Sequence, residues 1–580
     1  MIPRHDVRGV AAALAAAIAL LRPLAAVAVD YAVGPGMPYV SVGDVPWESL
    51  EPGDNVLIHW RPEPYREKWV ICRRGTPDRP IAVRGVPGPA GELPVIDGRD
   101  AVTRPALRFW NEPRGVIKIG GASSPPDTLP AHIVIENLEV RSARPPHSFT
   151  GRSGTATYSN NAAAIYVEKA EHLTISNCIL HDSGNGLFIG VFDGRTRNVT
   201  VEGNWIRDNG IEGSIYEHNS YTAAIGLVFQ YNLYGPLRPG CGGNNLKDRS
   251  AGLVVRYNWI ESGNRQLDLV DGEDSPAVSG DPAYRTTFVY GNILVEPEGA
   301  GNSQIVHYGG DSGNEAIYRK GTLHFHNNTV VSTRAGNTTL LRLSTNDERA
   351  DCRNNVVYVT ASGSRLAMLA GAGMLDLRRN WFKPGWVAGH SGLTGTIDDD
   401  GTSITGASPG FLDEAAQDFR LAGGSACIDA AAPMHAAVLP DHAPARQYVV
   451  HRSGEPRPAA GALDLGAFEY CPPGSCGGDG DADADGDADA DGDAGPDGDA
   501  DGDAAEEADA APDVDRDSAG DAGEDAADAA PPVAASGEGC GCRLAARTPP
   551  AAATVVSILL LAALGASRPG GRGARQRGAR

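Results

Sequence analysis

The chain has 580 residues and a formal net charge of −23, but this charge is concentrated in one segment. Between Asp479 and Asp528 there are 22 acidic residues and one Arg, a net charge of −21, so the rest of the chain is nearly neutral. A nearly neutral fold without a basic stripe excludes nucleic acid as the expected partner. No glycine-rich loop follows a strand and opens a helix, which excludes a nucleotide site of that kind.

The N-terminal residues 1–28 predict a secretory signal peptide. Arg4 and Arg8 supply the positive charge, the apolar stretch "GVAAALAAAIALL" follows, and "AVA" at 26–28 is a small-x-small cleavage site. We therefore expect an exported protein whose mature chain begins near Val29.

Short apolar strands built around an asparagine recur through the middle of the chain, as in "VTVEGNWI" and "LVVRYNWI". The aligned asparagines are Asn137, Asn177, Asn204, Asn232, Asn258, Asn292, Asn328, Asn355 and Asn380. Their separations are 40, 27, 28, 26, 34, 36, 27 and 25 residues, which indicates a constant coil that carries loops of variable size. No ordinary amphipathic helix interrupts the run, which argues against a βαβ sheet or a leucine-rich repeat. A β-propeller would need a period of about 40 to 50 residues.

Strand-rich coils of this length predict an all-β fold, a right-handed parallel β-helix. Each coil would stack on the last at a strand spacing of about 4.8 Å. Equivalent asparagines would then lie one above another and form a ladder of amide hydrogen bonds, which explains why a poor strand residue recurs. We expect N-terminal coils and a cap over residues 29–130 and the core of the β-helix over residues 131–400.

Three early stretches carry a family resemblance: "LEPGDNVLIHW" (50–60), "RRGTPDRPIAVRG" (73–85) and "PVIDG" (94–98). With the repeats they resemble the bacterial right-handed β-helix superfamily that includes pectate-lyase-like and chondroitinase-B-like or alginate-lyase-like enzymes. The resemblance covers roughly residues 30–390. It implies a solenoid that binds an extended polysaccharide along a groove, but a fold alone does not determine the chemistry.

Polar residues gather on four successive predicted coils. They are His218 and Tyr221 in "YEHNSYTAAIG", Lys247 and Arg249 in "NNLKDRS", Asp268 and Asp271 in "QLDLVDGED", and His307 and Tyr308 in "QIVHYGG". Alternate residues of a strand point the same way, so Lys247 and Arg249 project together if Leu246 points inward. Asp268 would then lie about one coil from Lys247. Cations beside carboxylates shift pKa values and often mark a functional site.

The resemblance implies roles for these residues. In the chondroitinase-B-like lyases a Lys on one coil and an Arg on the next carry the elimination, so Lys247 would take the C5 proton of a uronic acid. The following coil reads "LDLVDGE", with acids where the family has a basic residue, and Arg249 would substitute from the same strand as Lys247. His218 completes the candidate catalytic set.

The remaining candidate residues would bind the substrate or a metal ion. Tyr221, His307 and Tyr308 are the candidate substrate-binding residues. No cofactor is certain from the sequence, and Ca²⁺ is the candidate, with Asp268 and Asp271 as its ligands.

Three functions remain open at this point. The first is elimination by Lys247, which must be neutral to act as a base; Arg249 would favour that state and Asp268 would oppose it. The second is hydrolysis by paired carboxylates, for instance Asp268 with Asp271 or Asp182. The third is a non-catalytic adhesin or structural glycan-binding protein, in which Lys247 and Asp268 form an ordinary salt bridge between coils.

Two further segments follow the predicted β-helix. Residues 401–470 contain "SACIDAAAP" and "RPAAGALDLGAFEY", which resemble the small β-rich module after such helices in anchored surface proteins. Residues 471–538 hold the acidic tract, which has no aromatic residue and a high like charge and therefore predicts a disordered linker. It is not an EF-hand, because position twelve counted from Asp481 is Gly492 where a Glu is needed.

The C-terminal residues 539–580 predict a membrane anchor. A Cys-Gly-Cys sequence precedes the apolar run "AAATVVSILLLAALGA" (551–566), and five arginines follow it. This order resembles bacterial C-terminal surface-sorting tails. We expect an exported protein held at the cell envelope or cell surface by its C-terminus. Cys471 and Cys476 are close enough to form a disulfide in that compartment.

Overall fold

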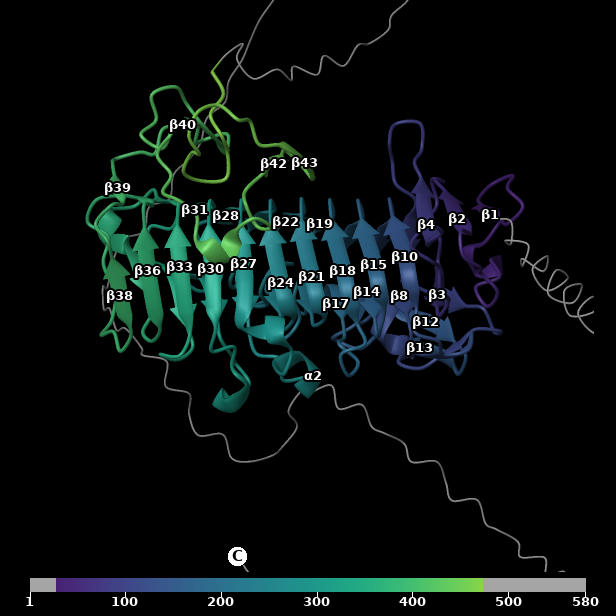
Figure 1. The fold of residues 1–580 in the computed structure, drawn as a ribbon. Coiled ribbons are helices and arrows are strands. Elements are labelled where there is room, and N and C mark those ends of the chain that lie inside the picture. The colour runs from purple at the N-terminus through teal and green to yellow at the C-terminus, as the bar shows by residue number, and fades with distance from the viewer. Residues whose placement is uncertain (1–27, 473–580) are drawn as a thin grey trace, which may run out of the picture. The chain divides into compact units, whose positions relative to one another are not determined.

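The structure is a computed structural model that describes residues 28–472 (Figure 1). The predicted signal peptide up to residue 27, almost all of the acidic linker, Cys476 and the C-terminal anchor lie outside the described residues. Within 28–472 we find no helix of the length and apolarity needed to cross a bilayer.

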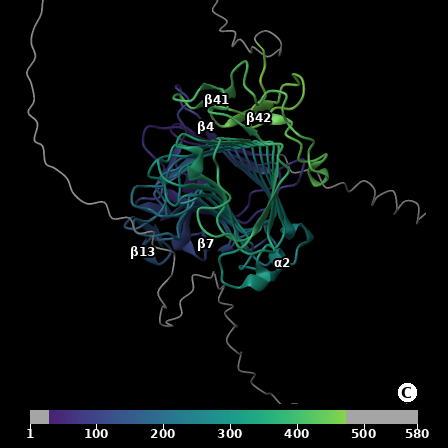
Figure 2. The ribbon, with the colours of Figure 1, turned by 90° about the vertical axis from the view of Figure 1, so that its left-hand side faces the viewer.

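Three large, almost entirely parallel sheets make up most of the described chain (Figures 1 and 2). Successive strands pass from one sheet to the next, so hydrogen-bonded neighbours within a sheet come from successive coils. This is the arrangement of a parallel β-helix, and the all-β prediction is confirmed at that level. The right-handed sense of the coil stays a prediction.

Sheet one consists of β1 (Asp30–Val33), β2 (Asn55–His59), β4 (Ile81–Val86), β10 (Ala131–Glu136), β15 (Glu171–Ser176), β18 (Arg197–Glu202), β21 (Ile225–Gln230), β24 (Ala251–Arg256), β27 (Thr286–Tyr290), β30 (Thr322–His326), β33 (Arg349–Arg353), β36 (Met374–Arg378) and β38 (Thr396–Asp399). Sheet two consists of β5 (Val95–Asp97), β11 (Glu139–Arg141), β16 (Ile179–His181), β19 (Trp205–Ile206), β22 (Leu233–Tyr234), β25 (Trp259–Glu261), β28 (Ile293–Glu296), β31 (Thr329–Ser332), β34 (Val356–Val359), β37 (Trp381–Phe382) and β39 (Ile404–Thr405).

Sheet three consists of β3 (Glu67–Ile71), β6 (Ala101–Thr103), β8 (Gly115–Ile119), β12 (Ser148–Gly151), β13 (Gly154–Thr157), β14 (Ala163–Val167), β17 (Asn185–Ile189), β20 (Ser220–Thr222), β23 (Leu246–Asp248), β26 (Leu267–Leu269), β29 (Gln304–Tyr308), β32 (Thr338–Leu343) and β35 (Leu366–Leu369). Short elements complete the described chain: the hairpin β7 (Arg108–Phe109) with β9 (Ala122–Ser124), the helix α2 (Pro276–Ser279), and the 3₁₀ turns η1 (Val42–Asp44), η2 (Glu112–Arg114), η3 (Pro282–Arg285), η4 (Glu315–Ile317), η5 (Gly363–Arg365) and η6 (Ala436–Val438).

The core fills the space between the three sheets, because alternate strand residues point inward. Val199, Leu227 and Leu253 are in register on neighbouring strands of sheet one, and all three are buried. Similar rows from the other sheets join the same apolar cluster. Each fully buried aliphatic side chain contributes about 1.5 to 3 kcal/mol, so this stacked core holds one coil on the next.

The predicted asparagine ladder lies at the bend between sheets one and two, and it begins at Asn204. The backbone N–H of Asn204 donates to Asn232 Oδ1 at 3.0 Å, and its Nδ2 donates to the same oxygen at 3.0 Å. The same pair of bonds recurs at Asn232, Asn258, Asn292, Asn328 and Asn355, and the ladder ends at Asn380.

The prediction that Asn137 and Asn177 belong to the ladder was wrong, because each lies one residue before the ladder position. Cys178, not Asn177, stands in register with the ladder, since its N–H donates to Asn204 Oδ1 at 2.9 Å. Asn137 and Asn177 occupy the preceding corner position, where φ is 59° and 53°. Asn tolerates this left-handed conformation better than most residues, so the same residue type serves two adjacent positions of the bend.

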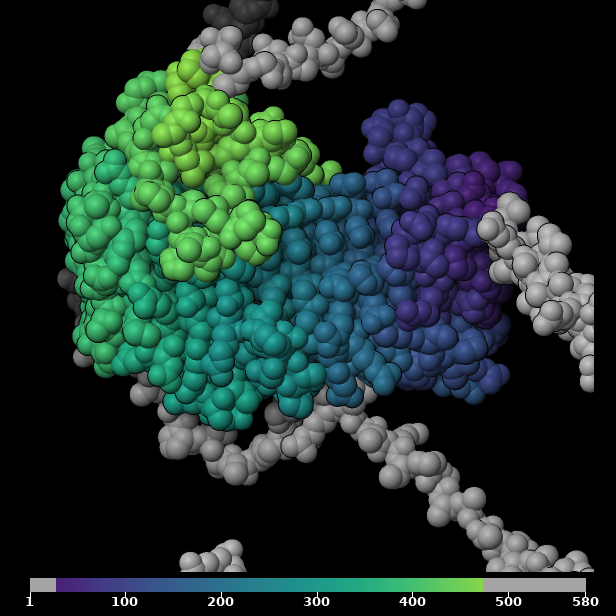
Figure 3. Space-filling view, viewed as in Figure 1, coloured from purple at the N-terminus to yellow at the C-terminus, as the bar shows by residue number. Residues whose placement is uncertain are grey.

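The segment after β39 forms a small module with two antiparallel hairpins, β40 (Phe411–Asp413) with β41 (Asp418–Leu421) and β42 (Arg446–Val449) with β43 (Ser453–Pro456). It packs on the outer face of sheet two, where Trp259 stacks on Phe419 with ring centroids 5.5 Å apart. Figure 3 shows this yellow-green module against the coils.

Candidate functional site

The predicted polar residues come together on the outer face of sheet three. The register places Tyr221 beside Lys247, Lys247 beside Asp268, and Asp268 beside His307 on the strands β20, β23, β26 and β29. Leu246 points inward and is fully buried, as the alternation requires. The structure therefore brings four of the predicted residues into one row across four coils.

Tyr308 does not belong to that row. It follows His307 directly, so it points to the other side of the strand, where it pairs with Leu269 and Leu343 in the apolar core. Its side chain has no exposed surface. The assignment of Tyr308 to substrate binding is corrected on this ground, because a residue inside the coil contacts no ligand outside it.

Asp268 is the centre of the row. Its Oδ2 accepts hydrogen bonds from Lys247 Nζ at 3.0 Å and Asn244 Nδ2 at 2.8 Å, and its Oδ1 lies 2.8 Å from His307 Nδ1. Burial alone would raise the pKa of Asp268, but the charge of Lys247 and the bond to His307 outweigh it and hold this pKa well below its usual range. Asp268 is therefore a permanent anion at neutral pH.

Lys247 and Arg249 converge on a carboxylate that the sequence did not indicate, that of Asp311. Asp311 Oδ1 accepts from Arg249 Nη2 at 2.9 Å, and Oδ2 accepts from Lys247 Nζ. Burial would raise the pKa of Asp311, but the two cations lower it. One carboxylate thus bridges the two predicted cations.

Asp311 reaches this position because the chain leaves β29 through two glycines. Gly309 has φ of +137°, and a Cβ on Gly310 would lie 2.1 Å from the ring of Tyr318. Larger residues would push the loop away from the sheet. The motif "HYGGD" is the signal that could have identified Asp311, since a double glycine after a strand permits a close turn back over it.

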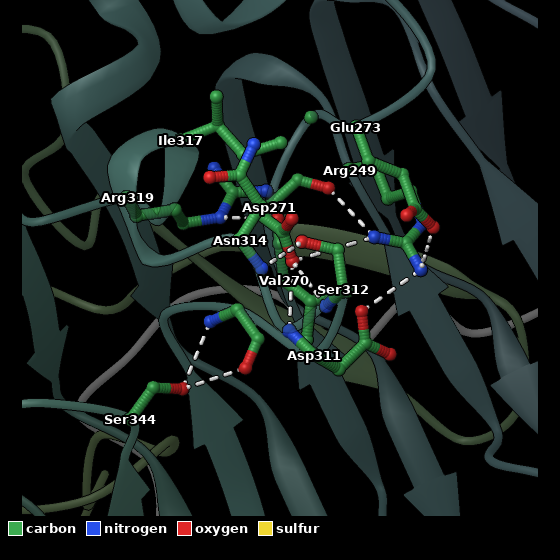
Figure 4. A network of polar contacts seen from close by, with 12 residues as sticks. Arg249, Val270, Asp271, Glu273, Asp311, Ser312, Asn314, Ile317, Arg319 and Ser344 are labelled. Carbon is green, nitrogen blue, oxygen red and sulfur yellow. Dashed lines mark hydrogen bonds and ion pairs between the residues drawn. The ribbon is translucent and has the colours of Figure 1, made fainter. Parts of the chain in front are cut away.

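Arg249 is surrounded by acceptors (Figure 4). Its Nε donates to Tyr221 Oη at 2.8 Å, its Nη1 to the backbone oxygen of Asp271 at 2.7 Å, and its Nη2 lies 2.8 Å from Glu273 Oε1. Burial opposes the charge of Arg249, but Tyr221, Asp311 and Glu273 raise its pKa above the ordinary value. Arg249 therefore stays positively charged although only 4% of its surface is exposed.

Asp271 lies beneath the loop and not beside Asp268. Its Oδ1 accepts from the backbone N–H groups of Asp311 and Ser312 at 2.7 and 3.3 Å, as Figure 4 shows, while its buried Oδ2 has no hydrogen-bond partner. Asp268 is committed to Lys247 and His307 instead. The two predicted Ca²⁺ ligands thus serve separate partners, and the Ca²⁺ site stays a prediction.

His218 is buried at the edge of the cluster, and its ring stacks on that of Tyr221 with centroids 5.7 Å apart. Its Nδ1 accepts from the backbone N–H of Asn244 at 2.9 Å. Burial lowers the pKa of His218 to about 3, so its imidazole is neutral and its Nδ1 acts as an acceptor. Burial also lowers the pKa of His307, whose Nε2 lies 2.9 Å from Ser344 Oγ.

Below the cluster a second ion pair closes the base of the site. Arg319 is fully buried, donates to the backbone oxygens of Val270 and Ser250 at 2.9 and 2.8 Å, and lies 3.6 Å from Asp248 Oδ1. Asp248 also accepts from Thr222 Oγ1 at 2.7 Å. Arg319 thereby ties together the ends of β23 and β26, the strands that carry Lys247 and Asp268.

The comparisons with known proteins show a similarity of fold and nothing finer. No family model matches the chain, and no curated protein matches it. The alginate lyase from Paenibacillus sp. str. FPU-7 is 13% identical, with a TM-score of 0.35 over 56% of this chain and 91% of that one. The GH136 lacto-N-biosidase from Eubacterium ramulus is 13% identical, with a TM-score of 0.34 over 65% and 68%.

A mutant of the PL6 family alginate lyase AlyGC is 12% identical, with a TM-score of 0.30 over 61% of this chain and 51% of that one. The structural neighbours are thus polysaccharide lyases and glycoside hydrolases. At these identities and scores we base no step of the chemistry on them.

Proposed function

We propose that the protein is an exported, envelope-anchored, right-handed β-helix that binds extracellular uronate-containing polysaccharide and cleaves it by β-elimination. The observation that carries the proposal is the bridging of Lys247 and Arg249 by one carboxylate, that of Asp311. Two buried cations that converge on a carboxylate form a receptor for that group. A uronate carboxylate has the same charge and shape, and it takes the place of Asp311 when the loop moves aside.

Lys247 Nζ is held by the carboxylates of Asp268 and Asp311, and Arg249 shares the second of them. The proposed elimination requires Lys247 as its neutral amine, because only a free electron pair can accept the C5 proton.

The elimination then proceeds as follows. Lys247 Nζ takes the proton from C5, the C4–C5 double bond forms, and the bond from C4 to the glycosidic oxygen breaks. We assign the protonation of the leaving oxygen to Tyr221, because its Oη accepts from Arg249 Nε and that bond does not use its own proton. Burial raises the pKa of Tyr221, so the phenol keeps this proton until the leaving group needs it.

A second candidate function is glycan binding without cleavage. It is favoured by the low exposure of Lys247, 8%, and by its two carboxylate partners. In that case the cluster is a stabilising network, and carbohydrate binds elsewhere on the coils. The two functions differ in whether product forms.

The test is the ultraviolet absorbance of the unsaturated uronide, measured on alginate, pectate and chondroitin-type chains with and without Ca²⁺. Absence of this signal on all of them contradicts elimination. New reducing ends without the absorbance would indicate hydrolysis by paired carboxylates, and binding without any product would indicate the glycan-binding function.

The matched variants are Lys247→Met and Lys169→Met. Lys169 Nζ also pairs with a carboxylate, Asp127 Oδ2 at 2.6 Å, and is also buried, at 3% exposure against 8% for Lys247, but it lies outside the cluster. Loss of a general base costs about 10²- to 10⁴-fold in rate. We expect this loss in Lys247→Met and unchanged turnover in Lys169→Met. Equal turnover of the two variants, both checked for folding, removes Lys247 from the site.

A further inference from the structure

A second group of ligand-type side chains lies on sheet one, where the C-terminal module crosses it. His324 on β30 and Asp351 on β33 are neighbours in register on the outer face, and His435 arrives from the module immediately before η6. Their donor atoms all lie within 4.8 Å of one another. Among residues 28–472 this is the group of three His, Cys, Asp or Glu side chains that converges in this way.

The approach of His435 is set by backbone contacts and not by a loose loop. Arg353 Nη1 donates to the backbone oxygen of Pro433 at 2.8 Å. Asn354 Nδ2 donates to the oxygen of Ala432 at 2.9 Å, and its Oδ1 accepts from the N–H of Ala432 at 2.8 Å. Three hydrogen bonds therefore hold the chain just before His435 against the corner that follows β33.

The two buried members have the spacing of metal ligands. His324 Nδ1 lies 3.5 Å from Asp351 Oδ2, and this buried nitrogen has no hydrogen-bond partner. Ligands at about 2.0 to 2.1 Å from a tetrahedral ion are separated by about 3.3 to 3.4 Å. A buried nitrogen without a partner carries a desolvation cost that a bound ion would remove.

The remaining donors are also suitably directed. His435 Nδ1 accepts from the N–H of Ala437 at 3.1 Å, which leaves its Nε2 for a ligand. Arg353 holds the carboxylate of Asp351, with Nε at 3.0 Å from both oxygens. This contact orients the ligand carboxylate from outside, as partners of ligating side chains commonly do.

We propose that His324, Asp351 and His435 bind one divalent transition-metal ion of the Zn²⁺ type, which fastens the C-terminal module to the β-helix. Two imidazoles and one carboxylate favour such an ion over Ca²⁺, which takes six to eight oxygen ligands. Water completes the coordination. The site lies on sheet one and does not depend on the function proposed for sheet three.

The test uses the full-length chain, purified through a tag without histidine and stripped with a chelator. Titration with Zn²⁺ followed by calorimetry should give one tight site per chain, and Zn²⁺ should raise the melting temperature. His435→Ala changes an exposed residue, so the fold is retained, and we expect its affinity to fall by at least about tenfold. Its melting temperature without metal should stay close to that of the parent chain, because the change removes one exposed hydrogen bond and one ring contact.

The control is His442→Gln. His442 is another histidine of the module that contacts sheet one, and its ring stacks on that of Phe288 with centroids 3.7 Å apart. This variant should bind Zn²⁺ like the parent chain. The acidic tract is present in every variant, so its weak cation binding cancels in the comparison, and excess Ca²⁺ should not displace the tight ion. Parent-like affinity in His435→Ala, an equal loss in His442→Gln, or displacement by Ca²⁺ would each overturn the proposal.

Discussion

Two buried polar rows cross the same coils, and they differ in almost every property. The ladder from Asn204 to Asn380 repeats one neutral residue, and each amide from Asn204 to Asn355 bonds the next at about the same 3 Å distances. The row on sheet three has a different residue on every coil and carries charges of both signs. Two buried oxygens beside it, Asn244 Oδ1 and Asp271 Oδ2, have no hydrogen-bond partner.

The difference is the one expected between a stabilising row and a row with the function proposed above. A neutral row with every group paired costs little to bury and adds stability with each coil. A charged row needs close pairing merely to offset desolvation, so its presence is weak evidence for stability. The unpaired buried oxygens beside the charged row add no stability, which supports the function proposed for it.

The largest effect should come from breaking the ladder. Asn292→Ala removes the acceptor of the Asn258 N–H and the donor to the oxygen of Val255. Each buried group left without a partner costs about 1 to 3 kcal/mol, so we expect a loss of about 2 to 6 kcal/mol in urea unfolding. Asn337→Ala, which changes an exposed residue, is the control, and its free energy of unfolding should stay within about 0.5 kcal/mol of that of the parent chain. Similar values for the two would show that the ladder is not stabilising.

Breaking the charged row should cost less than the upper end of the range expected for the ladder. Lys247→Met leaves the carboxylates of Asp268 and Asp311 without their shared cation, and removal of one partner from a buried pair costs about 3 to 5 kcal/mol. In Lys247→Met with Asp268→Asn the combined loss should be smaller than the sum of the single losses, because the uncompensated charge is gone. Additive losses in denaturant unfolding would contradict the pairing.

The ladder has no titratable group, whereas the cluster around the charged row includes His218, so the two regions should also differ in their response to pH. The pKa of His218 is lowered by burial to about 3, whereas an unfolded histidine titrates near 6.5. Below about pH 6.5 the unfolded chain therefore binds a proton that the folded chain does not. As the pH is lowered further, the free energy of unfolding decreases by up to about 1.4 kcal/mol per pH unit. Between pH 7 and pH 5 the free energy of unfolding should decrease less in His218→Gln than in the exposed control His390→Gln. Equal losses would assign the effect to other groups.

The smallest expected effect concerns the loop over the cations. Asp311→Asn removes the charge that competes with a uronate carboxylate at Lys247 and Arg249. Affinity for uronate oligomers should rise by about fivefold, because less of the protein is held in the occupied state. Ser312→Ala, the next residue in the loop, should leave affinity unchanged. Weaker binding by Asp311→Asn would show that Asp311 contacts the ligand and does not compete with it.

Much of the site could be predicted because strand alternation is a local rule. It placed Lys247 and Asp268 on the outward face of neighbouring coils, and the register confirms their adjacency. The same rule should have excluded Tyr308, since consecutive strand residues cannot both face outward. Asp311 could not be placed by alternation, because it lies in a loop whose path depends on Gly309 and Gly310.

The sequence by itself determined the period of the coils, the faces of the strands and the residue type at the bend. These follow from the geometry of an extended chain that repeats at short separation. Only the tertiary structure decided the one-residue shift at Asn177, the carboxylate laid across Lys247 and Arg249, and the approach of His435 to His324. These contacts join segments far apart in the chain, and loops of variable length hide such contacts from any local pattern.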